Sequence, residues 1–426
     1  MKLSGIFDAI RRFVLSRYIL FAAGGLSIAA MAGVGAIELL RIVPPGRWSR
    51  ITIGLIALCA ASVPFFLFLF YRHWFLLRTL RSPAPAGAPS LSEFHARFRR
   101  ALAELETFPQ LTRDGNDPVY ALPWYLVLGG AESGKTTALR AVDDFSALLP
   151  PVREGSTQAW DPWFSDTMLA IDTTSRYTVR SDAVRDQREW FWLLDSIRRA
   201  HKLEPIAGAI ITVAANEIAS SSAEKLREAG DRMRECVREA IERLRCNFPL
   251  YILITKCDLI EGFQEFFSRF QPRILHDAVG YVTDYAASDG RKAFEADGPV
   301  KLRVALQEIF QRFHVLRLSI LGAGAPEALK QPVFCFPQEF GVLADNLNTF
   351  GERLLEVRVN YHTPVFRGVF LSSAQQQATR FSSLRRELRI AEEPALAESR
   401  GQSYFLEDFF KTVLPRDRFL AARLQR

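Results

Sequence analysis

A phosphate-binding loop is the feature of this sequence whose residue types and spacing could carry chemistry. Residues 129–136 read GGAESGKT and fit the pattern GxxxxGK[ST], in which small residues let backbone N–H groups turn inward towards phosphate oxygens. The lysine of the pattern supplies a positive charge to the β- and γ-phosphates, and the hydroxyl that follows it is a ligand for Mg²⁺. The residues that we expect to contact a nucleotide here are Gly129, Gly130, Ser133, Gly134, Lys135, Thr136 and Thr137.

A carboxylate is expected next to the magnesium ion. The apolar residues 168–171 form a short predicted strand that ends at Asp172, downstream of the loop, as a Walker B strand does. A lone Asp at the end of a strand is more often the cap of a turn or a helix, but the preceding phosphate loop favours the metal site. We therefore expect Thr136 and Asp172 to be ligands of Mg²⁺.

A third motif follows the apolar strand predicted at 250–254. The residues Thr255, Lys256 and Asp258 form the pattern TKxD, which resembles the base-reading motif of GTPases. In that motif the carboxylate accepts hydrogen bonds from guanine and the lysine stem packs on the ring. The alternative is that the aspartate caps the helix that follows. The expected cofactor is Mg²⁺ with GTP or ATP, and the motif argues against adenine as the base.

Apolar strands that alternate with helices are needed to position these motifs. A doubly wound α/β sheet with the P-loop NTPase arrangement would place the ligand at the carboxyl ends of its strands. Segments rich in Phe at 262–330 and 376–426 are expected to be helical and to face the core. The expected domains are a nucleotide-binding core at 121–261, a helical insertion plus the last sheet strands at 262–375, and a C-terminal helical segment at 376–426. The predicted strands are 124–128, 168–172, 208–213, 250–254, 333–336 and 366–371.

Two uncharged segments precede the nucleotide-binding core. Residues 18–37 and 51–71 hold 20 and 21 residues without a charge, and a membrane-spanning helix needs about 20. The short linker between them predicts a two-helix transmembrane hairpin over 1–81 with both ends on one side. Basic residues flank the hairpin, and by the positive-inside rule both ends are expected in the cytoplasm.

The charge distribution and the cysteine spacing argue against a nucleic acid partner, a disulfide framework and a zinc site. Residues 1–81 hold ten Lys and Arg but only two Asp and Glu. The positive excess of this segment is larger than the net charge of +7 of the whole chain, so the basic character of the protein comes from the flanks of the uncharged segments. It therefore gives no reason to expect a nucleic acid partner. The five cysteines are scattered, which argues against a disulfide framework or a zinc site. Residues 82–120 are predicted to be a Pro- and Ala-rich linker followed by a stalk helix, which the capping box SLSE opens at 90–93.

The motifs, taken together and in order, resemble the TssM/IcmF family, the inner-membrane component of type VI secretion systems. The segments that carry the resemblance are LPWYLVLGGAESGKTTAL, STQAWDPWFSD, LAIDTTSRYT, FPLYILITKCDLIEGFQEFF, FPQEF and TPVFRGVFLSSAQQ. The resemblance implies a bacterial inner-membrane protein with a cytosolic nucleotide-binding domain. It also implies a TssL-like inner-membrane partner, contacts with baseplate components and a homo-oligomer in the assembled complex. A TssJ-like lipoprotein would bind through a periplasmic part, beyond a third span that is not found before Arg426.

Two further positions take their expected roles from the family. Thr157 remains available as a switch residue that senses Mg²⁺, and Arg176 is the nearest polar candidate for a catalytic side chain, as it is in the family. The family segment DTAGRY reads DTTSRY here, so Ser175 stands where the family has glycine. A Cβ at this position removes the glycine's conformational freedom, so we expect slow hydrolysis and weak nucleotide-triggered switching.

Three functions are compatible with these motifs. The leading hypothesis is a scaffold subunit of a secretion machine whose nucleotide site, a possible NTPase, is regulatory or structural. The second is a membrane-anchored GTPase switch outside any secretion system. The third, an ATP-driven transport motor, is weakest, because TKxD argues against adenine.

Overall fold

All described residues belong to the second of two compact units of the chain, Gly87–Arg426. The structure is a computed structural model, and the transmembrane hairpin expected over 1–81 and the switch candidate Thr157 lie outside the residues it describes. None of the helices in the described part is long and apolar enough to cross a membrane. The described residues are 91–107, 118–149, 159–283, 297–324, 326–357, 365–374, 380–387 and 403–423.

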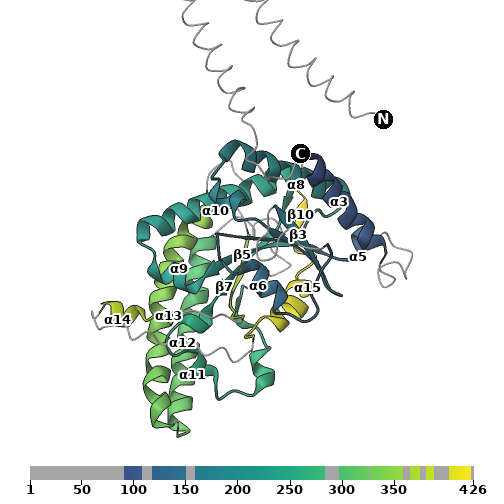
Figure 1. Ribbon diagram of the computed structural model, residues 1–426. Coiled ribbons are helices and arrows are strands. Elements are labelled where there is room, and N and C mark those ends of the chain that lie inside the picture. Colours follow the sequence, from purple (N-terminus) through teal and green to yellow (C-terminus); the bar gives the residue numbers. More distant parts are fainter. Residues whose placement is uncertain are drawn as a thin grey trace, which may run out of the picture. The chain divides into compact units, whose positions relative to one another are not determined.

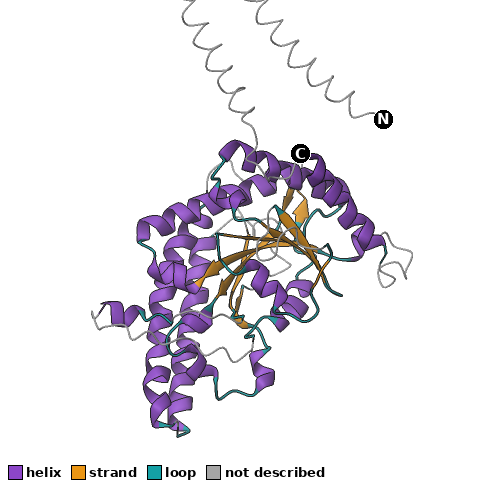
Figure 2. Ribbon diagram, viewed as in Figure 1, coloured by secondary structure: helices purple, strands orange, loops and turns teal. Residues whose placement is uncertain are grey.

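A mixed sheet of eight strands lies at the centre of the unit, with helices packed on both faces, which confirms the α/β class (Figure 2). The strand order is β2-β3-β4-β1-β5-β7-β9-β8. The five strands from β4 to β9 in this order run parallel, while β2, β3 and β8 pair antiparallel with their neighbours. The strands are β1 (Trp124–Gly129), β2 (Ser146–Ala147), β3 (Trp160–Phe164), β4 (Leu169–Thr173), β5 (Gly208–Ala214), β7 (Pro249–Thr255), β8 (Val279–Val282) and β9 (Val365–Leu371).

The strand order reverses at β1, which is where open α/β sheets place their ligands. The strands β3 and β4, which follow β1 in the sequence, lie on one side of it, and the later strands β5, β7 and β9 lie on the other side. In the parallel register Val127 lies beside Asp172, Gly129 beside Thr212, and Ala214 beside Thr255. The carboxyl ends of four strands therefore meet at one edge of the sheet.

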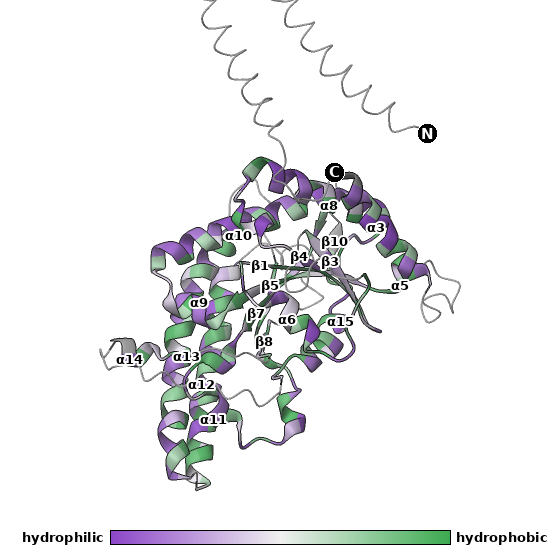
Figure 3. Cartoon of the chain, in the orientation of Figure 1, coloured by the Kyte–Doolittle hydropathy of each residue, from purple (hydrophilic) through white to green (hydrophobic). Residues whose placement is uncertain are grey.

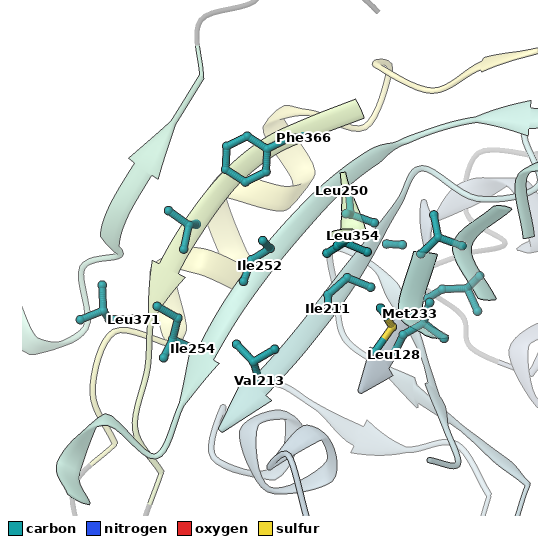
Figure 4. Close-up of a cluster of buried hydrophobic side chains, with 14 of the residues drawn as sticks. Leu128, Ile211, Val213, Met233, Leu250, Ile252, Ile254, Leu354, Phe366 and Leu371 are labelled. Carbon is teal, nitrogen blue, oxygen red and sulfur yellow. The ribbon is translucent and has the colours of Figure 1, made fainter. Parts of the chain in front are cut away.

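Successive side chains of each strand point to opposite faces of the sheet, so the core consists of two layers, one on each face. Leu126 and Leu128 of β1 point to one face and Tyr125 and Val127 to the other. Figure 4 shows the first layer, where Leu128, Ile211 and Ile252 lie with Met233 and Leu354 from the covering helices. The helices that contribute buried side chains to this layer include α3 (Leu91–Glu106), α8 (Ala183–Ala200), α10 (Ala223–Leu244), α12 (Gly298–Gly322) and α13 (Glu327–Leu354).

Side-chain caps mark the starts of two of the covering helices. Asp182 caps α8 by accepting a hydrogen bond from the backbone N–H of Arg185, and Ser222 caps α10 in the same way from Lys225. Hydrophilic and hydrophobic residues alternate along α3, α8 and α13, as helices with one buried face require (Figure 3). The stalk helix predicted from the capping box is α3, although nothing is described before Leu91.

The segment 333–336, predicted as a strand, is helical. It lies in α13, which packs beside α12 as a long helical pair (Figure 1). Val333, Phe336 and Phe340 are fully buried at helical spacing and pack with Phe266 and Phe313. The prediction was wrong because prolines at 332 and 337 disfavour a helix locally, while burial of the whole apolar stripe stabilises one.

Residues 403–417, which we call the C-terminal strap, were expected to be helical, and residues 407–416 do form one continuous helical stretch. The middle of this stretch is a five-residue π-helix, η4 (Phe409–Val413), and the short α-helix α15 (Leu414–Arg416) follows it directly. The strap packs Leu406, Phe409, Phe410 and Leu414 into the second core layer, beside α6 (Lys135–Arg140), and Tyr404 and Phe405 into the first, so it is firmly held. Its buried residues are Tyr404, Phe405, Leu406, Phe409, Phe410 and Leu414.

Hydrogen bonds fix the strap to three strands. The Tyr125 hydroxyl in β1 donates to the carbonyl of Leu414 at 2.5 Å. The Tyr251 hydroxyl in β7 donates to Asp417 at 2.7 Å, and Arg367 in β9 donates to both oxygens of Asp417 at 2.6 and 2.9 Å. Burial raises the pKa of both tyrosines, so each hydroxyl remains a donor.

The other short elements complete the connections. They are α5 (Pro118–Ala121), α7 (Arg176–Val179), α9 (Ala215–Ser220), η1 (Cys257–Leu259), α11 (Phe263–Phe267), η2 (Pro272–Leu275) and α14 (Ser383–Glu387). A separate two-stranded pair joins β6 (Cys246–Asn247) to β10 (Ala422–Arg423). The chain therefore returns from the strap to the strand that follows α10.

Candidate nucleotide site

The phosphate loop connects β1 to α6 and turns through two residues with positive φ. Glu132 has φ 54° and Gly134 has φ 79°. A Cβ on Gly134 would lie 3.0 Å from the Thr255 hydroxyl, and one on Gly129 would lie 2.2 Å from the Thr212 hydroxyl. Both glycines are therefore required, one for its backbone conformation and both for the close approach of β5 and β7.

Three hydroxyls hold the loop against the sheet. Ser133 and Thr212 share a hydrogen bond of 2.8 Å, and Thr212 also donates to the carbonyl of Leu128 at 3.1 Å. Thr255 donates to the carbonyl of Ser133 at 2.7 Å. Ser133 and Thr255, which were expected to contact the nucleotide, also fix the loop's shape through these hydrogen bonds.

Lys135 lies over the loop. Its side chain is buried, and its Nζ donates to the carbonyls of Gly129 at 3.1 Å and Gly130 at 2.9 Å. Burial lowers the pKa of Lys135, while the carboxylates of Asp172 and Glu217 counteract that effect. A cation held over a turn of backbone is the arrangement that a phosphate-binding loop needs.

Thr136 and Asp172 meet as the sequence predicts. The Thr136 hydroxyl donates to Oδ2 of Asp172 at 2.5 Å, and Asp172 is fully buried near the end of β4. The register beside Val127 brings the carboxylate to the first turn of α6. Thr137 follows in the same short helix and is partly exposed.

The TKxD residues lie at the same edge of the sheet, after β7. Lys256 has φ 57° and precedes η1, which contains the buried Asp258. Burial raises the pKa of Asp258, and a hydrogen bond from Ser373 opposes this effect. Ser373 follows β9 and exchanges backbone hydrogen bonds of 3.1 and 2.8 Å with Tyr404 of the strap. Sequence reasoning missed this serine, and its only signal was the run SSA directly after a predicted strand.

Arg176 is engaged elsewhere than at the loop. Its guanidinium donates to Asp186 at 2.9 Å and to Glu189 at 3.0 Å, both on α8. Ser175 before it has φ −60° and ψ −19°, a conformation that any residue adopts. Thr178 of α7, which the sequence did not single out, ties this turn to the loop by donating to the carbonyl of Gly129 at 3.2 Å.

A cavity of about 410 Å³ lies beside the loop. Of the nucleotide contacts predicted from the sequence, Gly130 alone lines it, so the cavity adjoins the expected phosphate position rather than coinciding with it. Thr178 and Glu217 form polar parts of its wall, and Met233 and Phe350 form apolar parts. Glu217 was not identified from the sequence, because a lone glutamate in a polar stretch carries no pattern.

Comparisons with known proteins point in the same direction as the motifs. Residues 183–426 match the family described as the IcmF-related N-terminal domain. The chain is 28% identical over 343 residues to the type VI secretion system component TssM1 of Pseudomonas aeruginosa, an alignment that covers 77% of this chain and 30% of that protein. It therefore spans less than a third of the length of that relative.

Among solved structures, a crystal structure of an S. thermophilus NFeoB mutant bound to GDP aligns with this chain. The alignment covers 55% of this chain and 98% of the NFeoB chain. The alignment has 11% identity and a TM-score of 0.24, which is too low to inform the fold or the ligand. The family match, by contrast, covers more than half of the chain. The chain belongs to the IcmF-related family.

Proposed function

We propose that this chain binds a magnesium nucleotide, GTP in preference to ATP, at the carboxyl edge of its sheet. The observation that carries the proposal is that three separate motifs converge there: the loop under Lys135, the Thr136–Asp172 contact and the buried Asp258. They come from the ends of β1, β4 and β7, which the parallel register brings to one edge. Each supplies a different part of nucleotide recognition.

The residues present fit Mg²⁺ and phosphate. A hydroxyl and a carboxylate form an oxygen-only set of the kind that Mg²⁺ prefers, and Thr136 and Asp172 would hold the ion. The ion would neutralise phosphate charge next to Lys135. A Cβ on Gly130 would meet nothing closer than 3.9 Å, so this turn of the loop is not crowded by side chains.

We further propose that hydrolysis is slow. Arg176, the catalytic candidate from the sequence, is paired with two carboxylates of α8 and not with the loop. Ser175 carries a Cβ where a glycine would move most freely. Turnover below the roughly 1–10³ s⁻¹ of ordinary enzymes is consistent with a regulatory or structural role for the nucleotide.

The proposed setting is a type VI secretion system. The chain's family and its similarity to a protein named as a type VI secretion component support this setting. The uncharged segments 18–37 and 51–71 support an anchor in the bacterial inner membrane with the nucleotide domain in the cytoplasm. There the chain would act as a scaffold subunit, with a TssL-like membrane protein, baseplate components and further copies of itself as partners. A TssJ-like lipoprotein would join the complex through a periplasmic region rather than through the nucleotide domain.

Titration of the purified protein with Mg-GTP, Mg-GDP and Mg-ATP tests the proposal. Lys135→Ala should weaken binding roughly 10–150-fold, because it removes a charge-assisted contact of about 1.5–3 kcal/mol. Lys330→Ala, which removes an exposed lysine of α13, is the matched control and should leave affinity unchanged. Asp258→Asn should lower GTP affinity but not ATP affinity. Equal dissociation constants for Lys135→Ala and wild type would mean that the loop is only structural.

A further inference from the structure

The pairing of β5 with β1 places Glu217 beside the phosphate loop. It lies in the first turn of α9, which starts directly after β5, and β5 pairs with β1 so that Thr212 lies beside Gly129. Both of its carboxylate oxygens are 3.9 Å from the position that a Cβ on Gly130 would occupy. The carboxylate therefore faces the backbone of the loop's first turn.

The surroundings of Glu217 combine a cavity with access to solvent. Its side chain is exposed, and it lines the 410 Å³ cavity together with Gly130, Ala131 and Thr178. Among the described residues, no hydrogen bond or ion pair occupies its carboxylate. A carboxylate free to accept a proton thus stands beside space large enough for water.

The other acidic groups near the loop have different roles. Asp172 accepts a hydrogen bond from Thr136 and is fully buried. Glu132 is an exposed residue of the loop itself. Glu228 lines the same cavity but lies on α10 and pairs with Arg232 at 3.6 Å. Glu217 is thus the acidic residue that both faces the loop's backbone and lines the cavity.

We propose that Glu217 is the general base for nucleotide hydrolysis, an inference that rests on the proposed function. Glu217 accepts a proton from a water molecule in the cavity as the water oxygen forms a bond to the terminal phosphorus. The bond between that phosphorus and the leaving oxygen breaks, which gives a nucleoside diphosphate and inorganic phosphate. The proton then leaves Glu217 for solvent through the exposed side of the carboxylate.

The charges around Glu217 suit this role. Partial burial raises the pKa of Glu217, and Glu132 raises it further, while Lys256, Lys135 and Arg232 lower it. The net direction is upward, which brings a carboxylate nearer to the neutral range in which a general base works best. Arg176 is not an alternative, because its charged guanidinium has no lone pair to accept a proton.

The test compares Glu217→Gln with Glu228→Gln, which makes the same change of charge in the same cavity. Single-turnover GTP hydrolysis should fall about 10²-fold or more in Glu217→Gln and stay unchanged in Glu228→Gln. The wild-type rate should fall as pH is lowered and Glu217 is protonated, whereas the rate of Glu217→Gln should lack this dependence. Affinity for GDP, measured by titration without turnover, should be the same in all three proteins.

Two results would overturn the assignment. One is a Glu217→Gln variant that hydrolyses GTP at the wild-type rate. The other is a variant that binds GTP more tightly with no change in rate, which would make Glu217 a repelling charge instead of a base. Wild-type protein that binds GTP without hydrolysing it would refute this inference alone, whereas absence of binding would refute the proposed function as well.

Discussion

Removing Asp417 should weaken the attachment of the C-terminal strap to the sheet and lower the stability of the unit. Its carboxylate accepts two hydrogen bonds from Arg367 and one from Tyr251, and the side chains of Arg367 and Asp417 are only 13% and 7% exposed. In Asp417→Ala the guanidinium stays largely buried without its countercharge. Breaking a buried ion pair in this way costs about 3–5 kcal/mol. At about 2–3 °C per kcal/mol for a large unit, the unfolding temperature should fall by roughly 6–15 °C.

Thermal unfolding of the purified protein, followed by circular dichroism, measures this effect. The matched control is Glu352→Ala, which breaks a bridge of 2.6 Å to Arg303 whose partners are 49% and 58% exposed. An exposed bridge contributes about 0–1 kcal/mol, so the control should unfold close to the wild-type temperature. Arg367→Met combined with Asp417→Leu should recover most of the lost stability, because neither charge then remains buried.

Equal unfolding temperatures for Asp417→Ala and Glu352→Ala would refute the reasoning. The same conclusion would follow if the double variant were as unstable as Asp417→Ala alone. In either case the buried charge of Arg367 would not be the source of the cost, and the strap would be held by its apolar residues without help from the ion pair.

Three further predictions concern the nucleotide and the membrane. Wild-type protein should show the same protease digestion of 153–180 with di- and triphosphate, whereas Ser175→Gly should make the two forms differ; a large difference in wild type would contradict this. GTP affinity should fall as pH is lowered, because the guanine contact needs ionised Asp258 and burial raises the pKa of that carboxyl, and titrations of Asp258→Asn should lack the dependence. Reporter fusions after residue 90 should read as cytoplasmic and fusions within 41–50 as periplasmic; the opposite pattern would exclude the predicted hairpin.

The parts of the fold that the sequence predicts are those that local spacing determines. Glycines, a lysine and a hydroxyl at fixed intervals require a loop between a strand and a helix, and β1, β5, β7 and β9 are where apolar runs predict them. Asp172 and Thr136 were expected to meet because both follow neighbouring strands, and they do. The boundaries of these strands agree with prediction within one or two residues.

The parts that the sequence does not predict depend on long-range packing. The apolar run 333–336 has the composition of a strand, and only contacts with distant phenylalanines make it helical. The pairing of Arg176 with Asp186 and Glu189 depends on where α8 packs. Glu217 acquires its position from the register of β5 against β1, which no local pattern reveals.

The strap also has a consequence for synthesis. The hydrogen bond between Tyr125 and Leu414 joins residues that are 289 positions apart, in the first strand of the sheet and near the end of the described chain. At about 5–20 residues per second, a ribosome needs roughly 15–60 s to add that length. During this interval the apolar surface that Phe409, Phe410 and Leu414 will cover is exposed on the nascent chain. This face of the sheet therefore gains its cover only after the strap has left the exit tunnel, so the strap must be synthesised before the second core layer can close.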